Sequence, residues 1–194
     1  MLMLVLIRNL ICLIALLVLF PIIVICGLLV IIEDGLPVIF KQARLGKDKK
    51  EFMIYKLRTM KKNVPSLGTH EIDSTLYLRV GSLLRISKLD ELPQLFNVIS
   101  GDLNLVGPRP GLPNQTDLKE SRANKNIFLI KPGITGLGQV TGYNMSNPPL
   151  LSEVDKVYMD SKSMLLDIKI LIATFTPLFR KQLKQFVLKR INHV

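Results

Sequence analysis

Tryptophan is absent from this chain of 194 residues, and histidine and cysteine occur only twice each. His70 lies in an expected loop and His193 at the C-terminal end, which argues against a Ser-His-Asp hydrolase and a histidine-rich zinc site. Cys12 and Cys26 show neither metal-ligand spacing nor a disulfide framework, so they are expected to be small core or lipid-facing residues. No GxGxxG or Walker A pattern is present, so no dinucleotide or P-loop site is expected.

Positive charge dominates the composition. The chain has 26 lysines and arginines against 15 aspartates and glutamates, a net charge of +11. Such an excess is typical of proteins that meet nucleic acid, an anionic membrane surface or phosphorylated substrates. Four tyrosines, eight phenylalanines and no recognition-helix pattern accompany the charge, so no nucleic-acid partner is expected. The length, without repeats or low-complexity tracts, suits one modest domain.

The N-terminus carries a long apolar run. Residues 10–32 contain no charged side chain, and 23 helical residues extend roughly 35 Å at about 1.5 Å each, enough to cross a bilayer. The run predicts an N-terminal membrane helix over residues 1–33, followed by a second region over residues 34–194. A cleaved signal peptide is the nearest alternative, but it would have a shorter apolar part and a small-residue cleavage site, so cleavage is not expected. Pro21 removes one backbone hydrogen bond and predicts a kink; a simple spanning helix remains the default from hydropathy.

The charges after this run indicate an orientation. Residues 41–62 hold nine basic side chains against Asp48 and Glu51, which is a positive-inside pattern. We therefore expect residues 34–194 to face the cytoplasm, where cysteines stay reduced.

Two short strands are expected at residues 37–40 and 52–55, joined by a turn around Gly46. Lys56 and Arg58 alternate at the end of the second strand, so they share one face, where two cations could meet a diphosphate. A solvated basic face close to the membrane is the alternative. Residues 63–73 predict a loop, interpreted as a lid, and residues 76–84 predict a helix. Arg85 follows that helix, five residues before Asp90.

An acidic pair, Asp90 and Glu91, precedes Pro93. Because Pro93 fits a first helical turn, Asp90 is expected to be the N-cap of a helix that runs from Gln94 to Gly101. A helix start keeps a carboxylate ionised and attracts phosphate, so Asp90 could attack an activated phosphorus. Glu91 could accept a proton or bind metal, and the pair suits Mg²⁺ beside a diphosphate. The alternative is that Asp90 is an ordinary N-cap and that Glu91 merely interacts favourably with the helix dipole.

Arg109 lies between two prolines, which restrict the backbone and lower the entropy lost on gripping an anion. Residues 131–144 contain four glycines, which allow either close approach to a nucleotide or plain tight turns. Tyr143 follows the last of them and could stack on a base or a sugar.

The C-terminal part repeats apolar residues at helical spacing over residues 164–172, interrupted by Asp167 and Lys169. Pro177 then begins a basic amphipathic stretch. Residues 163–194 are therefore interpreted as interfacial helices on an anionic bilayer. A core helix with a solvated basic face is an equal alternative for this stretch.

Several segments together resemble one family, the bacterial sugar transferases, or monotopic phosphoglycosyl transferases. The resemblance is carried by residues 85–98 (RISKLDELPQLFNV) and 101–110 (GDLNLVGPRP), and by residues 40–46, 55–60, 131–140 and 165–171. Nearly the whole chain is covered. The resemblance implies an α+β, helix-rich monotopic membrane enzyme of the bacterial inner membrane, with a re-entrant N-terminal helix whose ends are both cytoplasmic.

The family transfers a sugar 1-phosphate from a UDP-sugar to a polyprenol (undecaprenyl) phosphate and releases UMP, the first membrane step of surface glycan assembly. The resemblance implies that Asp90 is the nucleophile, that Glu91 is its partner, that Mg²⁺ is the cofactor and that downstream glycosyltransferases are possible partners. The expected substrate-binding residues are Lys56, Arg58, Arg85, Arg109, Tyr143 and Asp167. The resemblance favours substrate contact for Lys56 and Arg58 and implies that Asp167 is an ion-pair anchor for an active-site arginine.

Two positions depart from the family pattern. Phe20 stands where a serine usually precedes the proline, and Tyr143 stands where an arginine is frequent. The first departure concerns the re-entrant geometry and the second concerns one substrate contact. A non-catalytic polybasic module that docks on anionic lipids within a glycan assembly complex is the rival hypothesis.

Overall fold

The computed structural model describes residues 2–62 and 76–191, and the helices predominate. The expected loop at residues 63–73, with His70, and the terminal His193 lie outside the described residues. The chain divides into two compact units, each described by itself. The first consists of Met1–Gln42 and Met53–Gly101, and the second of Ala43–Phe52 and Asp102–Val194.

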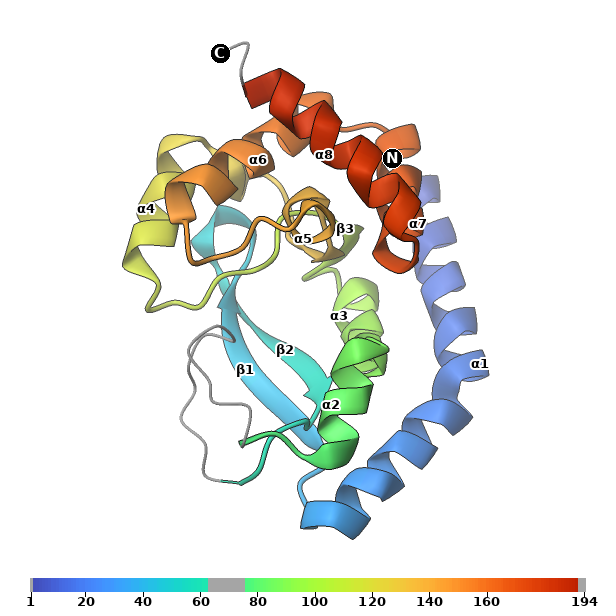
Figure 1. Cartoon of the computed structure of the whole chain (residues 1–194). Coiled ribbons are helices and arrows are strands. Elements are labelled where there is room, and N and C mark those ends of the chain that lie inside the picture. The colour runs from blue at the N-terminus through green and yellow to red at the C-terminus, as the bar shows by residue number, and fades with distance from the viewer. Residues whose placement is uncertain (1, 63–75, 192–194) are drawn as a thin grey trace. The chain divides into compact units, whose positions relative to one another are not determined.

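The apolar N-terminal run forms helix α1 (Leu2–Asp34), which contains Pro21. The helix is continuous and bends part-way along its length (Figure 1). Pro21 accounts for the bend because proline donates no backbone hydrogen bond and its ring crowds the preceding turn. Within the described part of the chain, α1 is the one helix long and apolar enough to cross a membrane.

Most of the α1 surface is exposed and apolar. Leu17, Val18 and Phe20 point in different directions around the helix, yet each is more than 60% exposed. Among the described side chains of α1, the buried ones form a narrow stripe of Cys12, Leu16, Cys26 and Val30, with the buried Gly27 beside it. A helix that is apolar all round needs an apolar medium, so this surface indicates membrane association.

The buried stripe packs against the rest of the first unit. Its other elements include α2 (Arg79–Ile86), the 3-10 helix η3 (Leu89–Gln94) and α3 (Leu95–Ile99), all of which contact α1. Cys26 and Val30 share a hydrophobic cluster with Leu57, Leu78 and Leu84. Near the end of α1, the Glu33 carboxylate accepts hydrogen bonds from the Arg79 and Val80 amides at 2.6 and 2.9 Å. Glu33 therefore caps α2, whose own N-cap residue provides no side-chain bond.

The predicted hairpin is confirmed, with longer strands than expected. Strand β1 (Ile39–Leu45) pairs with β2 (Glu51–Leu57), and the short 3-10 helix η1 (Lys47–Lys49) connects them. Asp48 and Lys49 have φ values of 55° and 60° in this connection. The sequence pattern missed the second half of β1 because charged and polar residues there resemble a turn.

The second unit holds a short parallel pair between β3 (Asn104–Val106) and β4 (Gly133–Thr135). Asn104 pairs with Gly133, and Val106 pairs with Thr135. The helices of this unit are α4 (Thr116–Asn124), η4 (Ile127–Leu129), α5 (Leu137–Thr141), α6 (Pro148–Ser161), α7 (Met164–Phe175) and α8 (Pro177–Ile191).

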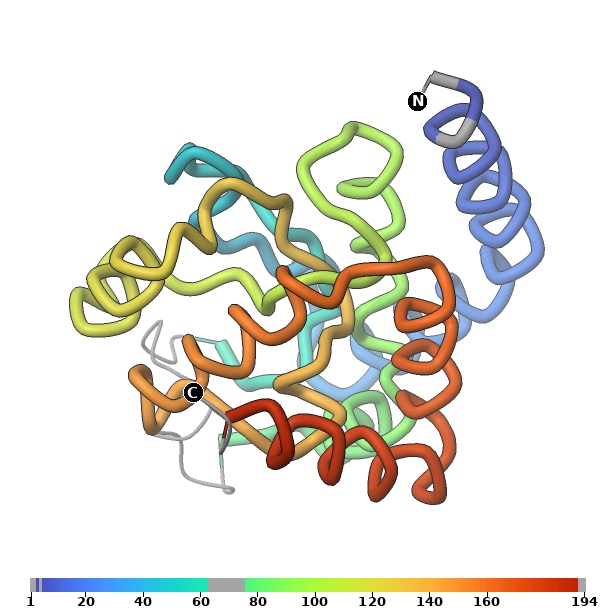
Figure 2. The backbone as a smooth tube through the Cα atoms, turned by 90° about the horizontal axis from the view of Figure 1, so that it is seen from above, coloured from blue at the N-terminus to red at the C-terminus, as the bar shows by residue number. Residues whose placement is uncertain are grey.

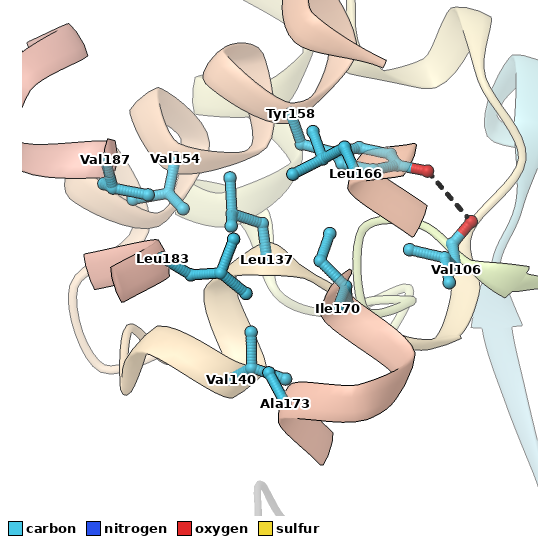
Figure 3. Packing of buried hydrophobic residues seen from close by; sticks show 10 residues of the cluster. All are labelled: Val106, Leu137, Val140, Val154, Tyr158, Leu166, Ile170, Ala173, Leu183 and Val187. Carbon is cyan, nitrogen blue, oxygen red and sulfur yellow. Dashed lines mark hydrogen bonds between the residues drawn. The ribbon is translucent and has the colours of Figure 1, made fainter. Parts of the chain in front are cut away.

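Helices α5, α6, α7 and α8, together with the end of β3, enclose a second hydrophobic core (Figure 3). The buried Tyr158 hydroxyl lies 3.2 Å from the Val106 carbonyl oxygen, which connects α6 to the end of β3. The cluster consists of Val106, Leu137, Val140, Val154, Tyr158, Leu166, Ile170, Ala173, Leu183 and Val187.

The sequence left open whether the C-terminal stretch forms interfacial helices or a core helix with a solvated basic face, and α7 and α8 differ in this respect. In α8, Leu183 and Val187 are buried in the core, as a core helix with a solvated basic face requires. In α7, Met164, Leu165 and Phe175 are each more than 60% exposed. The exposed apolar face expected of an interfacial helix therefore lies mainly on α7.

Gly133 provides a test of this close packing. A Cβ at Gly133 would lie 2.1 Å from the backbone nitrogen of Gly107, which cannot move aside as a flexible side chain can. We expect Gly133→Ala to destabilise the protein by about 1–3 kcal/mol or more, measured by thermal unfolding in detergent. Gly27→Ala is the control, since its Cβ would meet only the Val38 side chain, at 3.1 Å. Equal melting temperatures for the two variants would contradict the prediction.

Candidate active site

The acidic pair lies on η3, and its helix begins earlier than predicted. The N-cap is Lys88, with φ 60° and no side-chain cap bond, so the expectation of Asp90 as N-cap is wrong. The reason is that a 3-10 turn starts at Leu89, and Pro93 lies inside η3 and not in the first turn of a new α-helix. The predicted helix from Gln94 to Gly101 is confirmed as α3 at Leu95–Ile99, and Gly101 has a φ of 89° just beyond it.

Asp90 is buried, with 5% of its surface exposed. Its neighbour Leu89 packs against the hydrophobic cluster that includes Val30 of α1. The carboxylate is therefore carried by a short helix that is anchored on its apolar side.

Asn97 fixes η3 and α3 against the hairpin. It is 1% exposed, its Nδ2 donates to the Met53 carbonyl at 2.7 Å, and its Oδ1 accepts from the Tyr55 amide at 3.2 Å. Because both backbone partners belong to β2, this amide side chain holds the strand beside the acidic pair.

Lys56 and Glu91 form an ion pair across this junction. Lys56 Nζ lies 2.7 Å from Glu91 Oε1, and each side chain is 14% exposed. The sequence did not predict this pair, and the expected contact of Lys56 with a substrate diphosphate stays a prediction.

Arg58 is held elsewhere in the same unit. Its Nη1 donates to Asp34 Oδ2 at 2.5 Å, and its Nη2 donates to the carbonyl oxygens of Asp34 and Gly35. The side chain is buried. Arg58 therefore fastens the end of the hairpin to the end of α1, a structural role that the sequence reasoning did not foresee.

Arg85 lies in the last turn of α2. Its guanidinium stacks on the Tyr77 ring, 4.6 Å from the ring centroid, a cation–π arrangement. Within residues 2–62 and 76–191, its buried Nη1 atom has no hydrogen-bond partner. A guanidinium nitrogen in that state can bind an anionic oxygen.

In the second unit, a buried ion pair fixes the Pro-Arg-Pro segment. Arg122 of α4 donates from Nε and Nη2 to Asp155 Oδ2 of α6 at 2.9 and 2.7 Å, and both side chains are 4% exposed. Arg122 Nη1 also donates to the Arg109 carbonyl oxygen at 2.8 Å. Burial raises the pKa of Asp155, and the Arg122 guanidinium opposes that shift.

The hairpin tip supports the same segment. Arg44 Nη1 donates to the Pro110 carbonyl at 3.1 Å, and the Leu45 amide donates to the Gly111 carbonyl at 2.9 Å. On the other side of Arg109, the Gly133 amide donates to the Pro108 carbonyl at 3.0 Å. Backbone positions on both sides of Arg109 are thus held by hydrogen bonds, in addition to the restriction that its prolines impose.

The glycines of residues 131–144 serve backbone packing. A Cβ at Gly136 would lie 2.1 Å from the Gly107 carbonyl oxygen, and Gly142 has a φ of 87°. Backbone packing thus accounts for Gly136 and a turn accounts for Gly142, and the approach to a nucleotide stays a prediction. Tyr143 is half-buried against the second core.

Asp167 contacts a tyrosine. Tyr158 donates its hydroxyl hydrogen to Asp167 Oδ1 at 2.8 Å. Burial raises the pKa of Asp167, while the Tyr158 hydrogen bond and Lys162 lower it. Among the described residues, no hydrogen bond or ion pair between Asp167 and an arginine is recorded, so the anchoring role rests on the family resemblance alone.

The donor set around η3 fits magnesium only in part. Asp90 and Glu91 supply carboxylate oxygens, the ligands that Mg²⁺ prefers. Among the described residues, no group of three or more aspartate, glutamate, histidine or cysteine side chains could hold a metal. Mg²⁺ commonly binds through one or two carboxylates and completes its shell with water and substrate phosphates, so two carboxylates are compatible with it.

The sequence reasoning missed Asn97, Arg122 and Asp155. Asn97 lies within the RISKLDELPQLFNV stretch that carries the family resemblance, and its position four residues after Pro93 gave no hint of its bonds to β2. Arg122 and Asp155 are 33 residues apart, and no local pattern joins them.

In the first unit, the buried Asp90 lies next to Glu91, which is paired with Lys56, and in the second unit the backbone of Arg109 is held by Arg122. The sequence profile of the family described as Bacterial sugar transferase matches residues 3–181. The chain belongs to this family, whose members are enzymes that transfer sugar phosphates.

Three relatives illustrate the similarity. The uncharacterized sugar transferase EpsL of Bacillus subtilis is 42% identical over 164 residues, which are 84% of this chain and 78% of EpsL. A UDP-glucose:undecaprenyl-phosphate glucose-1-phosphate transferase of Xanthomonas campestris is 36% identical, over 71% of this chain and 31% of that protein. A UDP-N-acetylgalactosamine-undecaprenyl-phosphate N-acetylgalactosaminephosphotransferase of Aeromonas hydrophila is 34% identical, over 79% and 38%. The chain thus spans about a third of the last two proteins.

The Arg122–Asp155 pair predicts a large stability effect. We expect Asp155→Asn to cost about 3–5 kcal/mol of unfolding free energy, because it leaves a buried guanidinium without its counter-charge. Urea unfolding in detergent measures this cost. Asp160→Asn is the matched control, since its pair with Lys156 is exposed and is worth less than about 1 kcal/mol. Similar costs for the two variants would show that the buried pair is not a major support.

Asp167→Asn separates the Tyr158 contact from the arginine-anchor hypothesis. Asparagine keeps an oxygen that can accept the Tyr158 hydrogen bond, so we expect stability to change by less than about 1 kcal/mol and the donor KM to stay within about twofold. Thermal unfolding and initial rates measure these values. A donor KM raised more than about tenfold at unchanged stability would instead support an arginine anchor.

Proposed function

We propose that this protein transfers a sugar 1-phosphate from a UDP-sugar to a polyprenol phosphate, with undecaprenyl phosphate as the expected acceptor, and releases UMP. The observation that carries the proposal is the buried Asp90 beside Glu91, which is paired with Lys56 at 2.7 Å inside the family-matching region. Relatives named for undecaprenyl-phosphate transfer use glucose or N-acetylgalactosamine donors. These names support the reaction class and leave the sugar open.

In the first step, a carboxylate oxygen of Asp90 bonds to the sugar-bearing phosphorus of the UDP-sugar. The bond between that phosphorus and the bridging oxygen breaks, and UMP leaves with the electron pair. The product is a sugar-phosphoryl aspartate, and covalent catalysis of this kind divides one difficult displacement into two easier ones. The burial of Asp90 limits access of water, which would otherwise hydrolyse the acyl phosphate.

In the second step, a phosphate oxygen of the polyprenol phosphate bonds to the same phosphorus. The bond to Asp90 breaks and the carboxylate returns to its starting state, leaving a lipid-linked diphosphate sugar. Glu91 is proposed to accept a proton from the incoming phosphate. Its ion pair with Lys56 orients the carboxylate for this role.

Positive side chains would hold the diphosphate. In the first unit, Arg85 offers a buried Nη1 atom without a hydrogen-bond partner in the described part of the chain. The family resemblance assigns a phosphate contact to Arg109 as well, whose backbone Arg122 holds within the second unit. Guanidinium groups bind phosphate oxygens with two parallel hydrogen bonds and keep their charge at all relevant pH values. Arg58 contributes by fastening the hairpin to the end of α1.

Magnesium is the proposed cofactor. Asp90 and Glu91 would hold it together with phosphate oxygens of the substrate, and the ion would neutralise charge on the diphosphate. Without such a charge, two phosphorylated substrates would repel one another and the carboxylates.

The membrane setting is proposed to be the bacterial inner membrane, with residues 34–194 on the cytoplasmic face. The exposed apolar surface of α1 and the basic residues after it support this orientation. The bend in α1 at its single proline supports re-entry into the same leaflet. The exposed apolar residues of α7 would then contact the interface.

UMP release tests the reaction and the nucleophile together. The detergent-solubilised protein is incubated with Mg²⁺, undecaprenyl phosphate and each of several UDP-sugars. We expect release with one sugar, and we expect Asp90→Asn to lower the rate on the order of 10³-fold or more, as loss of a nucleophile does. Chelation of Mg²⁺ should also stop release.

Asp160→Asn serves as the control because this carboxylate is exposed and distant in sequence. A labelled donor without acceptor should give one equivalent of UMP and a labelled protein, which Asp90→Asn should not form. Undiminished activity of Asp90→Asn would refute the mechanism. Binding to anionic vesicles without turnover of any donor would favour the non-catalytic docking module.

A further inference from the structure

A cavity of about 340 Å³ opens between α7 and α8 in the second unit. The two helices are consecutive and in contact, and Figure 2 shows them meeting at the end they share and diverging from it. The cavity is lined by Ser161, Ser163, Leu165, Leu166, Lys169, Phe179, Gln182, Leu183, Phe186 and Arg190. None of these residues belongs to the proposed catalytic or substrate-binding set.

The floor of the cavity is apolar. Leu166 and Leu183 belong to the buried core, and Phe179 and Phe186 are partly buried against it. Leu165 at the mouth is 63% exposed. Beyond the mouth, exposed apolar side chains continue over α7 as Met164, Ile168, Ile172 and Phe175. The apolar lining is therefore continuous with a surface suited to acyl chains.

The rim of the cavity is cationic. Lys169 comes from α7 and Arg190 from the end of α8, and neither forms an ion pair within the part of the chain that the structure describes. The Arg190 guanidinium stands over the Phe186 ring at 5.6 Å, so one of the two charges is held at the apolar lining. Ser163 is occupied as the N-cap of α7 through the Leu166 amide.

We propose that this cavity binds one anionic phospholipid of the surrounding bilayer. Its phosphate would lie between Lys169 and Arg190, and the part of its acyl chain nearest the head group would lie along Leu165, Phe179 and Phe186. An amphiphile with a single negative head matches a site whose floor is apolar and whose rim carries two positive charges. A sugar nucleotide fits poorly, since it would leave polar groups against the apolar floor without hydrogen bonds.

The inference goes beyond the proposed transfer reaction and uses only its membrane setting, as the source of the lipid. Lipid binding is measured without donor or acceptor, so its failure is distinguishable from a failure of UMP release.

The test compares two variants that remove the same charge. Lys169→Gln with Arg190→Gln removes both rim cations. Lys181→Gln with Lys184→Gln removes two exposed cations of α8 that do not line the cavity. The full chain in neutral detergent is titrated with phosphatidylglycerol and, separately, with phosphatidylcholine, and bound lipid is counted by native mass spectrometry.

We expect one phosphatidylglycerol per chain, in preference to phosphatidylcholine. The rim variant should bind it about tenfold or more weakly, and the control variant within about twofold of the unmutated protein. UMP release and circular dichroism verify that both variants are folded.

Equal weakening in the two variants would overturn the proposal and indicate diffuse surface attraction. Equal binding of phosphatidylcholine would also overturn it, because no negative head would then be recognised. Full competition by millimolar glycerol phosphate would overturn the lipid assignment in favour of a simple phosphate site.

Discussion

The C-terminal end of α1 is the constraint on which the first unit depends. Within five residues, Val30 fills the hydrophobic cluster, Glu33 caps α2 and Asp34 binds Arg58. α1 also contacts η3, the short helix that carries Asp90 and Glu91. The membrane-associated helix and the acidic pair therefore belong to one compact unit. Any lateral displacement of this end of α1 would disturb the α2 cap and the hairpin, so the short helix with the acidic pair is packed on α1 and is not tethered to it by a linker.

In the second unit, the buried Arg122 holds the Pro-Arg-Pro segment around Arg109 in place. Arg122 contacts Asp155 and the Arg109 carbonyl, and it lies at 3% exposure. Removing this much charge from water is costly, and only full hydrogen bonding compensates for it. The close approach of Gly107 to Gly133 and Gly136 excludes side chains from the base of the same segment. An arginine loses less entropy on binding phosphate if its backbone is already fixed. Under the proposed reaction, this lower entropy loss at Arg109 would offset the cost of burying the Arg122–Asp155 pair.

Local patterns predicted elements well and their exact limits poorly. The hairpin, α2, α3, α7 and α8 all appear where hydrophobic periodicity and turn residues indicated. The start of η3 was misplaced because Pro93 was taken to mark a first helical turn, whereas a 3-10 helix accommodates it inside. Local sequence patterns also could not decide between an interfacial helix and a core helix for the C-terminal stretch. Both helices have apolar and basic residues, and only packing shows that α8 buries Leu183 and Val187 while α7 exposes Leu165 and Phe175.

By itself, the sequence determined the apolar helix, the excess of positive charge and the acidic motif with its family. These are properties of consecutive residues, and hydropathy or spacing is enough to read them. Only the tertiary structure decided which charges meet. Lys56 finds Glu91 across 35 positions, Arg58 finds Asp34 across 24 and Arg122 finds Asp155 across 33. A lysine or arginine has the same local appearance whether it binds substrate, fastens a strand or neutralises a buried carboxylate, because its partner is chosen by how distant segments pack.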